Sequence, residues 1–222
     1  MATLPFTMPL DAPPPPLEPV TLEGRLVRLE PLSVAHLPAL IEIGQGPRET
    51  FALTNVPADE AAMRRWLEVA LAAQARFVAL PFATIDRRDG TVIGTTRFAN
   101  IETFVWPDGA PRRPSHSPDA VEIGWTWLSP RAQRTGINTE AKLLMLTHAF
   151  EWLRVTRVNL KTDARNLRSR AAIERLGARQ DGVLRAHSPA WDGRGLRDTA
   201  LYSILAGEWP AAKTALQERL AR

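Results

Sequence analysis

The segment Arg131–Lys142 joins a strand pattern to a helix pattern, and a junction of this kind is suited to holding phosphate. Before it, residues 121–128 alternate apolar and other side chains with period two. Gly136 falls at the turn, and without a Cβ it lets the backbone approach a ligand. The first turn of the next helix offers unpaired N–H groups and the positive end of its dipole. That helix is predicted from apolar residues at helical spacing: Leu143, Leu144, Leu146, Ala149, Phe150 and Leu153.

The loop belongs to neither of two common phosphate-binding classes. The chain contains no Gly-x-x-x-x-Gly-Lys-Ser/Thr string of nucleoside-triphosphate loops and no Gly-x-Gly-x-x-Gly fingerprint of dinucleotide loops. The segment that remains, Gln133-Arg-Thr-Gly-Ile-Asn138, resembles the Gln/Arg-x-x-Gly-x-Gly/Ala pyrophosphate loop of the GNAT superfamily of acetyl-CoA-dependent N-acetyltransferases. Asn138 stands where a small residue is more usual.

The resemblance extends over about residues 22 to 209. It is carried by four further segments: Leu22–Leu29, Glu122–Trp125, Asp163–Ser169 and Leu176–Ala178. The chain is most similar to the RimJ/RimL-like branch, whose members acetylate the N-termini of ribosomal proteins. The strings Asn138–Lys142 and Gly193–Asp198 fit a subgroup with diverse substrates, so the resemblance supports the family more firmly than the acceptor.

The sequence patterns predict that the chain has three segments, of which one forms a folded domain. Residues 1–20 contain seven prolines and form an extended, proline-rich N-terminal arm. Residues 21–210 form a single acetyltransferase domain, and residues 211–222 form a C-terminal helical tail. Within the domain, strands are predicted at 22–29, in a hairpin over 77–101, and at 121–128, 157–163, 183–187 and 197–205. Helices are predicted at 33–44, 59–76, 138–153 and 166–177.

This order predicts an α/β fold with a mixed, mostly antiparallel central sheet of about seven strands flanked by about four helices. The resemblance adds a V-shaped splay between the fourth and fifth strands, with the pantetheine arm of the cofactor lying against Trp127 and Leu128. It also implies cofactor-binding roles for Gln133, Arg134, Thr135, Gly136, Ile137, Asn138, Thr139, Asn166 and Ser169. Asn166 is alternatively a helix cap, because asparagine is favoured at that position.

Acetyl transfer to an amine requires a base, because an ammonium must lose a proton before it attacks. The chain has no cysteine, so a covalent acetyl-cysteine intermediate is excluded and direct attack in a ternary complex is expected. Glu122 is the candidate base: strand alternation places it on the face opposite Ile123, Trp125 and Trp127. Alternatively, Glu122 only pairs with a cation or orients the amine. The oxyanion is expected to bind a backbone N–H near Leu128.

The proton donor for the departing thiolate is less obvious. Many GNAT proteins have a tyrosine where this chain has Ile173, and its single tyrosine is Tyr202. Ser169 is the candidate donor; alternatively, it only forms a hydrogen bond to pantetheine or to the preceding helical turn. Two further carboxylates are weaker candidates for chemistry, since Glu140 in a first helical turn stabilises the helix and Asp163 is as readily a turn or capping residue.

The charge of the chain is divided at the loop. Residues 1–130 carry 11 Lys and Arg against 15 Asp and Glu, whereas residues 131–222 carry 17 against 9. The basic half suits acetyl-CoA, whose pyrophosphate and ribose phosphate are anionic. Nucleic acid is not expected as a partner, because no basic stripe interleaved with aromatic residues and no zinc-finger spacing occurs. The four histidines show no ligand spacing, so no metal is expected.

The predicted function is transfer of acetyl from acetyl-CoA to a primary amine, either a protein N-terminal α-amine or a small molecule. A non-catalytic acyl-CoA-binding or regulatory protein of the same fold is the alternative. The absence of cysteine and of an apolar run long enough for a membrane span favours a cytoplasmic enzyme without a membrane partner. The acceptor, the role of the proline-rich arm and a homodimeric state stay open.

Overall fold

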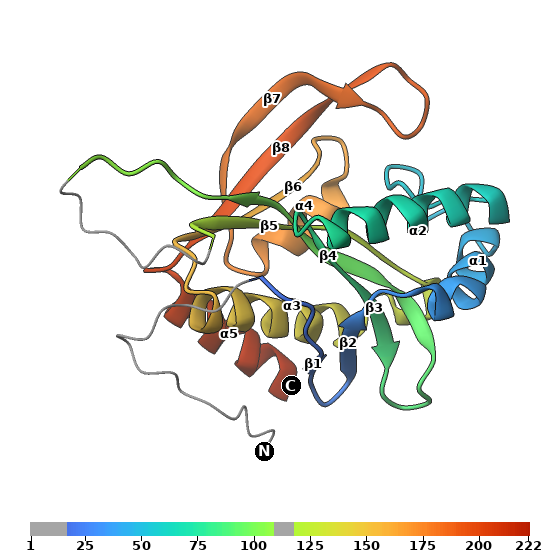
Figure 1. Ribbon diagram of the computed structural model, residues 1–222, viewed down its shortest axis with the longest axis horizontal. Coiled ribbons are helices and arrows are strands. Elements are labelled where there is room, and N and C mark those ends of the chain that lie inside the picture. The colour runs from blue at the N-terminus through green and yellow to red at the C-terminus, as the bar shows by residue number, and fades with distance from the viewer. Residues whose placement is uncertain (1–16, 109–117) are drawn as a thin grey trace.

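The computed structural model describes residues 17–108 and 118–222, which fold around one sheet (Figure 1). Eight strands in the described residues pair in the order β1-β2-β3-β4-β5-β6-β8-β7, and only β5 and β6 run parallel. The predicted mixed, mostly antiparallel sheet is therefore confirmed. The strands are β1 (Leu22–Glu23), β2 (Val27–Pro31), β3 (Leu80–Asp86), β4 (Val92–Glu102), β5 (Ala120–Leu128), β6 (Arg157–Asp163), β7 (Arg179–Pro189) and β8 (Leu196–Leu205).

Helices cover both faces of the sheet (Figure 1). On one face α3 and α5 bury apolar side chains against the strands, in a cluster that includes Ile123, Met145 and Leu216. On the other face α1 and α2 form a second cluster with Trp127. The helices are α1 (Leu37–Gln45), α2 (Glu60–Ala75), α3 (Ile137–Thr147, continued as a π-helix over His148–Trp152), α4 (Leu167–Glu174) and α5 (Trp209–Ala221).

The predicted first strand, residues 22–29, is divided into β1 and β2, which is why the sheet has eight strands instead of seven. The carboxylate of Glu140 on α3 accepts three backbone N–H groups between them, from Arg25 at 2.9 Å, Leu26 at 2.6 Å and Val27 at 2.9 Å. A Cβ on Gly24 would lie 2.4 Å from Glu140 Oε2. The chain therefore turns around this carboxylate, which the local alternation of residues 22–29 does not reveal.

Two predicted segments lie wholly or largely outside the described residues. Residues 1–16 contain most of the predicted proline-rich arm. Residues 109–117 contain most of the segment from Trp106 to Pro118, whose four prolines predict an exposed loop. At the other end, α5 begins at Trp209, before the predicted boundary at 210. Its side chains Trp209, Ala212 and Leu216 join the main core cluster. No helix of the described residues is long and apolar enough to cross a membrane.

The predicted splay lies between β5 and β6. These strands pair only at Ala120 with Arg157, Val121 with Val158 and Glu122 with Asn159. Beyond Glu122 the two strands separate, and β5 continues to Leu128 paired with β4 alone. The edge of β5 that faces β6 is thereby left without a neighbouring strand, and backbone groups on such an edge can pair with a bound molecule.

Candidate functional site

A cavity of about 1000 Å³ lies at this separation and has walls from six parts of the chain, besides the end of α5. They are the segment between α1 and α2, strand β5, strand β6, the loop and first turns of α3, helix α4, and the hairpin of β7 and β8. The end of α5 closes one side with Arg219, Leu220 and Arg222. The cavity thus connects the predicted pyrophosphate loop with Glu122.

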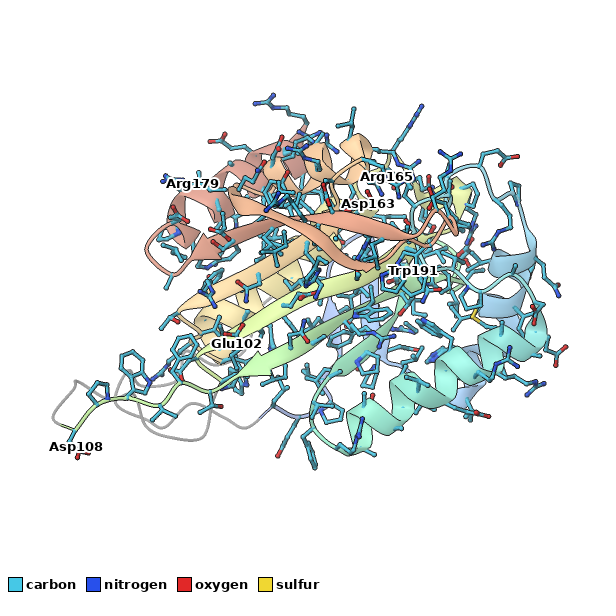
Figure 2. All side chains as sticks on the ribbon, turned by 90° about the horizontal axis from the view of Figure 1, so that it is seen from above. Glu102, Asp108, Asp163, Arg165, Arg179 and Trp191 are labelled. Atoms are coloured by element: carbon cyan, nitrogen blue, oxygen red, sulfur yellow. The ribbon has the colours of Figure 1, made fainter. Side chains whose placement is uncertain are left out.

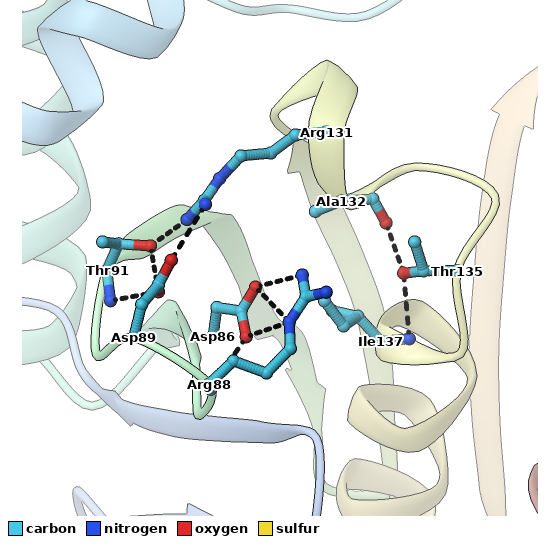
Figure 3. A network of polar contacts seen from close by, with 8 residues as sticks. All are labelled: Asp86, Arg88, Asp89, Thr91, Arg131, Ala132, Thr135 and Ile137. Atoms are coloured by element: carbon cyan, nitrogen blue, oxygen red, sulfur yellow. Dashed lines mark hydrogen bonds and ion pairs between the residues drawn. The ribbon is translucent and has the colours of Figure 1, made fainter.

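Hydrogen bonds of two of its own side chains, Gln133 and Thr135, hold the loop before α3 in place. Gln133 Nε2 donates to the carbonyl oxygen of Leu128 at 2.8 Å and to Thr50 Oγ1 at 2.9 Å. Thr135 Oγ1 donates to the carbonyl oxygen of Ala132 at 2.7 Å and accepts the N–H of Ile137 at 3.3 Å (Figure 3). These bonds connect the end of β5 to the first turn of α3.

Arg131 attaches the same loop to the turn between β3 and β4. Its Nη1 donates to Asp89 Oδ2 at 3.0 Å, and its Nη2 donates to Thr91 Oγ1 (Figure 3). The bonds from Arg131 and Thr91 hold the pKa of Asp89 below its usual range. All of these groups are exposed, so the contact positions the loop more than it stabilises the fold.

The predicted cofactor residues come together at this cavity with one exception. Ile137 does not line it, because its side chain is buried in the core cluster beneath α3. A Cβ on Gly136 would lie 2.9 Å from Leu26 Cδ1, so this glycine also serves close packing. The other predicted residues all line the cavity: Trp127, Leu128, Gln133, Arg134, Thr135, Gly136, Asn138, Thr139, Asn166 and Ser169.

The lining of the cavity is suited to an anion. Of its described residues, eight are Lys or Arg and only Glu122 is a carboxylate. Asn138 Oδ1 is buried without a hydrogen-bond partner in the described structure, as expected where a ligand supplies the missing donor. The eight cations are Arg134, Lys142, Lys161, Arg168, Arg175, Arg197, Arg219 and Arg222. With the start of α3, this set of donors fits a phosphate-bearing ligand with amide groups.

Helix α4 contributes Asn166 and Ser169. Asn166 Oδ1 accepts the N–H of Ser169 at 3.0 Å, so Asn166 is the helix cap while it also lines the cavity. Ile173 lines the cavity as well, whereas Tyr202 does not. Tyr202 is a buried residue of β8, and its hydroxyl donates to Glu174 at 3.1 Å and accepts from Arg170 at 2.8 Å, both on α4. Tyr202 is therefore not available to a ligand in the cavity.

A β-bulge in β5 changes which side chains share a face. Trp125 has a φ of 54°, and the register between β4 and β5 shifts there. Ile123 packs on the α3 face, whereas Trp127 packs between α1 and α2. The prediction that Glu122 faces away from both Trp125 and Trp127 is therefore wrong. Uninterrupted alternation fails at the bulge, and Glu122 lines the cavity together with both tryptophans.

Glu122 is buried, with one carboxylate oxygen held and the other open. Its Oε2 accepts from Asn100 Nδ2 at 2.6 Å and forms an ion pair with Lys161 Nζ at 2.9 Å. Asn100 has a φ of 45°, at an irregular position of β4. Oε1 lies over Gly124, where an added Cβ would sit 2.8 Å from it. Within the described residues no hydrogen-bond donor reaches Oε1, so this atom can accept a proton from a ligand.

The two other carboxylates considered from the sequence have structural partners. Asp163 is 1% exposed and accepts from Arg165 at 2.7 Å, and that bond holds the pKa of Asp163 below its usual value (Figure 2). Arg165 also pairs with Asp192 at 3.0 Å. Glu140 holds the turn between β1 and β2 and does not line the cavity. Neither carboxylate is placed to serve a ligand.

Two lysines of the site were not assigned a role from the sequence. Lys142 could have been found, because it falls on the buried face of a helix, between Ala141 and Met145. Lys161 gave no signal, since it alternates normally on β6. His187 and Trp191 on the β7–β8 hairpin also line the cavity, and the sequence already indicates Trp191 as a candidate for the wall of an acceptor pocket. No group of three His, Asp or Glu side chains that suits a metal occurs among residues 17–108 and 118–222.

Comparison with known proteins identifies relatives of this arrangement. The model of the acetyltransferase (GNAT) domain matches residues 26–179. A curated Bacillus subtilis (strain 168) protein, provisionally named ribosomal N-acetyltransferase YdaF, is 34% identical over 93 residues, which cover 42% of this chain and 49% of that protein. The match thus spans about half the length of this curated relative.

Solved structures match over most of the chain. A GCN5-related N-acetyltransferase from Brucella melitensis has a TM-score of 0.78 at 31% identity, covering 95% of this chain and 90% of its own. RimJ of Mycobacterium smegmatis, solved in complex with CoA-disulfide, has a TM-score of 0.73 at 22% identity, covering 92% of this chain and 97% of its own. At this identity, the similarity to RimJ shows a shared fold.

Proposed function

Because the chain belongs to the GNAT acetyltransferase family, we propose that it transfers acetyl from acetyl-CoA to a primary amine by direct attack in a ternary complex. One observation carries the proposal: a single cavity connects the basic loop before α3 with the open oxygen of Glu122. Acetyl-CoA supplies the activated acetyl group as a thioester. The chain supplies its binding, its orientation and the proton acceptor.

The cofactor would be held by backbone and cationic groups on the α3 side. Gln133–Gly136 and the first turn of α3 offer N–H donors to a pyrophosphate, and Arg134 adds charge at the same loop. The unpaired edge of β5 at Trp127 and Leu128 offers backbone groups to the amides of pantetheine. A β5 backbone N–H near Leu128 would bind the oxyanion, as proposed from the sequence.

The amine would enter on the other side of the sheet, where Glu122, Trp125, His187 and Trp191 line the cavity. Glu122 Oε1 would accept the amine proton, while Lys161 and Asn100 keep the carboxylate oriented through Oε2. The acceptor is a protein N-terminal α-amine or a small-molecule amine. The name of the YdaF relative, a ribosomal N-acetyltransferase, supports testing amines of ribosomal peptides first.

Calorimetric titration tests the cofactor site. We expect the parent protein to bind acetyl-CoA, and Gly136→Glu to bind it at least about thirtyfold more weakly, because the new carboxylate would repel the phosphates at the start of α3. Gly182→Glu adds the same group on β7 at a position where a Cβ meets no atom within 4 Å, and is expected to bind like the parent. Circular dichroism melting verifies that each variant is folded.

Two results would contradict this assignment. A folded parent that binds neither acetyl-CoA nor CoA would remove the proposed function, and unchanged binding by Gly136→Glu would remove the loop as the phosphate site. The acceptor is then sought with acetyl-CoA and a panel of peptides with free N-termini, amino acids and polyamines, by following release of the CoA thiol. Binding without release for any amine would favour the non-catalytic reading.

A further inference from the structure

Lys142 is a buried amine in the cofactor side of the cavity with no acidic partner. It lies on α3, is 4% exposed and lines the cavity. Its Nζ donates to Thr96 Oγ1 at 2.8 Å and to Thr126 Oγ1 at 2.6 Å. No ion pair of Lys142 occurs in the described part of the chain. An ammonium bonded only to neutral hydroxyls in the interior is costly, and such groups concentrate at functional sites.

The charged groups on the elements packed around Lys142 point elsewhere. On β5 Glu122 faces the opposite side of the sheet, and on β4 Arg97 stacks between Trp66 and Trp125 on that side. On α3 itself, Glu140 is bound to the β1–β2 turn. Burial alone therefore shifts the protonation of this amine, and it lowers the pKa of Lys142 to about 7. The amine can gain and lose a proton near neutrality.

Lys142 lies where a proton donor could reach the leaving group of the reaction. Its partner Thr126 lies between the bulge at Trp125 and the β5 edge at Trp127, on the path from the phosphate loop to Glu122. Hydroxyls such as Ser169 and Thr126 also line the cavity, but Tyr202 is buried elsewhere. A lysine ammonium is a stronger acid than a serine or threonine hydroxyl, so Lys142 is the better proton donor to a leaving thiolate on this path.

We propose that the Lys142 ammonium protonates the sulfur of CoA as the acetyl group leaves. This inference rests on the proposed function and deepens it. The amine nitrogen bonds to the acetyl carbon, the carbon–sulfur bond breaks, and its electron pair stays on sulfur. The proton on Lys142 Nζ moves to that sulfur and gives the free CoA thiol. The neutral Lys142 then regains a proton from solvent, and the proton taken by Glu122 is released to solvent.

The proposal is tested by titrating the thiol of CoA bound to the full-length protein. Because the chain has no cysteine, every thiolate absorbance change comes from CoA. An unperturbed alkyl thiol titrates at about pH 8.5. We expect the thiolate absorbance of CoA bound to the parent to appear about one pH unit lower or more, because a thiolate beside Lys142 keeps that amine protonated and the two groups titrate as a pair. Bound to Lys142→Met, CoA should titrate like free CoA.

Lys213→Met is the matched control. Lys213 lies on α5, pairs with Glu151 at 2.7 Å and does not line the cavity, so its removal should leave the thiol titration at the parent value. Equal titration of the thiol in the parent and in Lys142→Met would overturn the proposal while leaving acetyl transfer intact. Failure of the parent to bind CoA would overturn the proposed function, and the proposal with it.

Kinetics gives a second, independent readout. With an alanine-initiated hexapeptide as acceptor, or with acetyl-CoA hydrolysis if that peptide is not acetylated, Lys142→Met should lower kcat about 100-fold. Its Kd for acetyl-CoA should stay within about twofold of the parent. The fall of kcat above about pH 7 that an acid with this pKa imposes should disappear in the variant. An unchanged kcat and pH profile would overturn the proposal.

The variant is expected to fold, and its stability separates a chemical from a structural role. Thr96 and Thr126 already hydrogen-bond to each other at 2.8 Å, so methionine leaves neither hydroxyl without a partner. Removing an unpaired buried cation should raise the melting temperature. A lysine retained for structure would instead lower the melting temperature when replaced.

Discussion

Replacement of Glu122 by glutamine should lower kcat for acetyl transfer by about 10²–10³-fold. The amide oxygen of glutamine can still accept from Asn100 and Lys161, which now bond to Oε2 at 2.6 and 2.9 Å. The amide nitrogen would then take the place of Oε1 and cannot accept a proton. Geometry is thus retained while the base is lost. Initial rates of CoA release with a saturating amine measure the effect, and the Kd for acetyl-CoA should stay within about twofold.

Glu102→Gln is the control for this variant. Glu102 also accepts from one cation and one amide, Arg157 at 3.2 Å and Asn159 at 3.0 Å. It lies at the end of β4, two residues beyond Asn100, but does not line the cavity. Its kcat should match the parent. If Glu122→Gln retained kcat within about threefold, Glu122 would only orient the amine, and the base would lie elsewhere.

Replacement of Glu140 by alanine should reduce the free energy of unfolding by about 3–5 kcal/mol. Three backbone N–H groups, those of Arg25, Leu26 and Val27, lose their acceptor, and each buried donor left unpaired costs about 1–3 kcal/mol. Water entering the space left by the carboxylate reduces the sum of these costs. Urea unfolding measured at several pH values provides the comparison with the parent protein.

Glu151→Ala tests whether the stability cost of losing an acceptor depends on its burial or on the number of hydrogen bonds that it accepts. Glu151 accepts from Trp209 Nε1 at 2.8 Å and from Lys213 Nζ at 2.7 Å, but it is substantially exposed. Its loss should cost at most about 1 kcal/mol, because solvent replaces the lost partners. A cost for Glu140→Ala no greater than that for Glu151→Ala would show that the turn between β1 and β2 is held by other contacts.

Much of the fold follows from local patterns. The loop before α3, the strand β5 and the start of α2 are each encoded within about ten residues, and all three were predicted. The structure adds that Asp59 caps α2, because its side chain accepts the N–H of Ala62 at 2.8 Å. The partition of charge at residue 131 likewise anticipated the basic lining of the cavity.

The features that could not be predicted depend on distant contacts. The turn that divides β1 from β2 exists because of Glu140, more than 100 residues away in the sequence. The bulge at Trp125 is a property of the pairing between β4 and β5, and alternation alone placed Glu122 on the wrong side of the tryptophans. Arg219 and Arg222 reach the cavity only because α5 packs along α3. The isolated amine of Lys142 becomes apparent only when all its neighbours are known.

The brief pairing of β5 with β6 gives the ligand a mechanical role. Only three residue pairs join the two halves of the sheet directly, so the halves are fastened along one short part of their common border. A pantetheine chain seated against Trp127 would bridge the remainder as an additional strand. Occupied protein should therefore melt at a higher temperature and exchange the backbone amides of β5 and β6 more slowly. A cosubstrate bound in this way would complete the sheet that holds it.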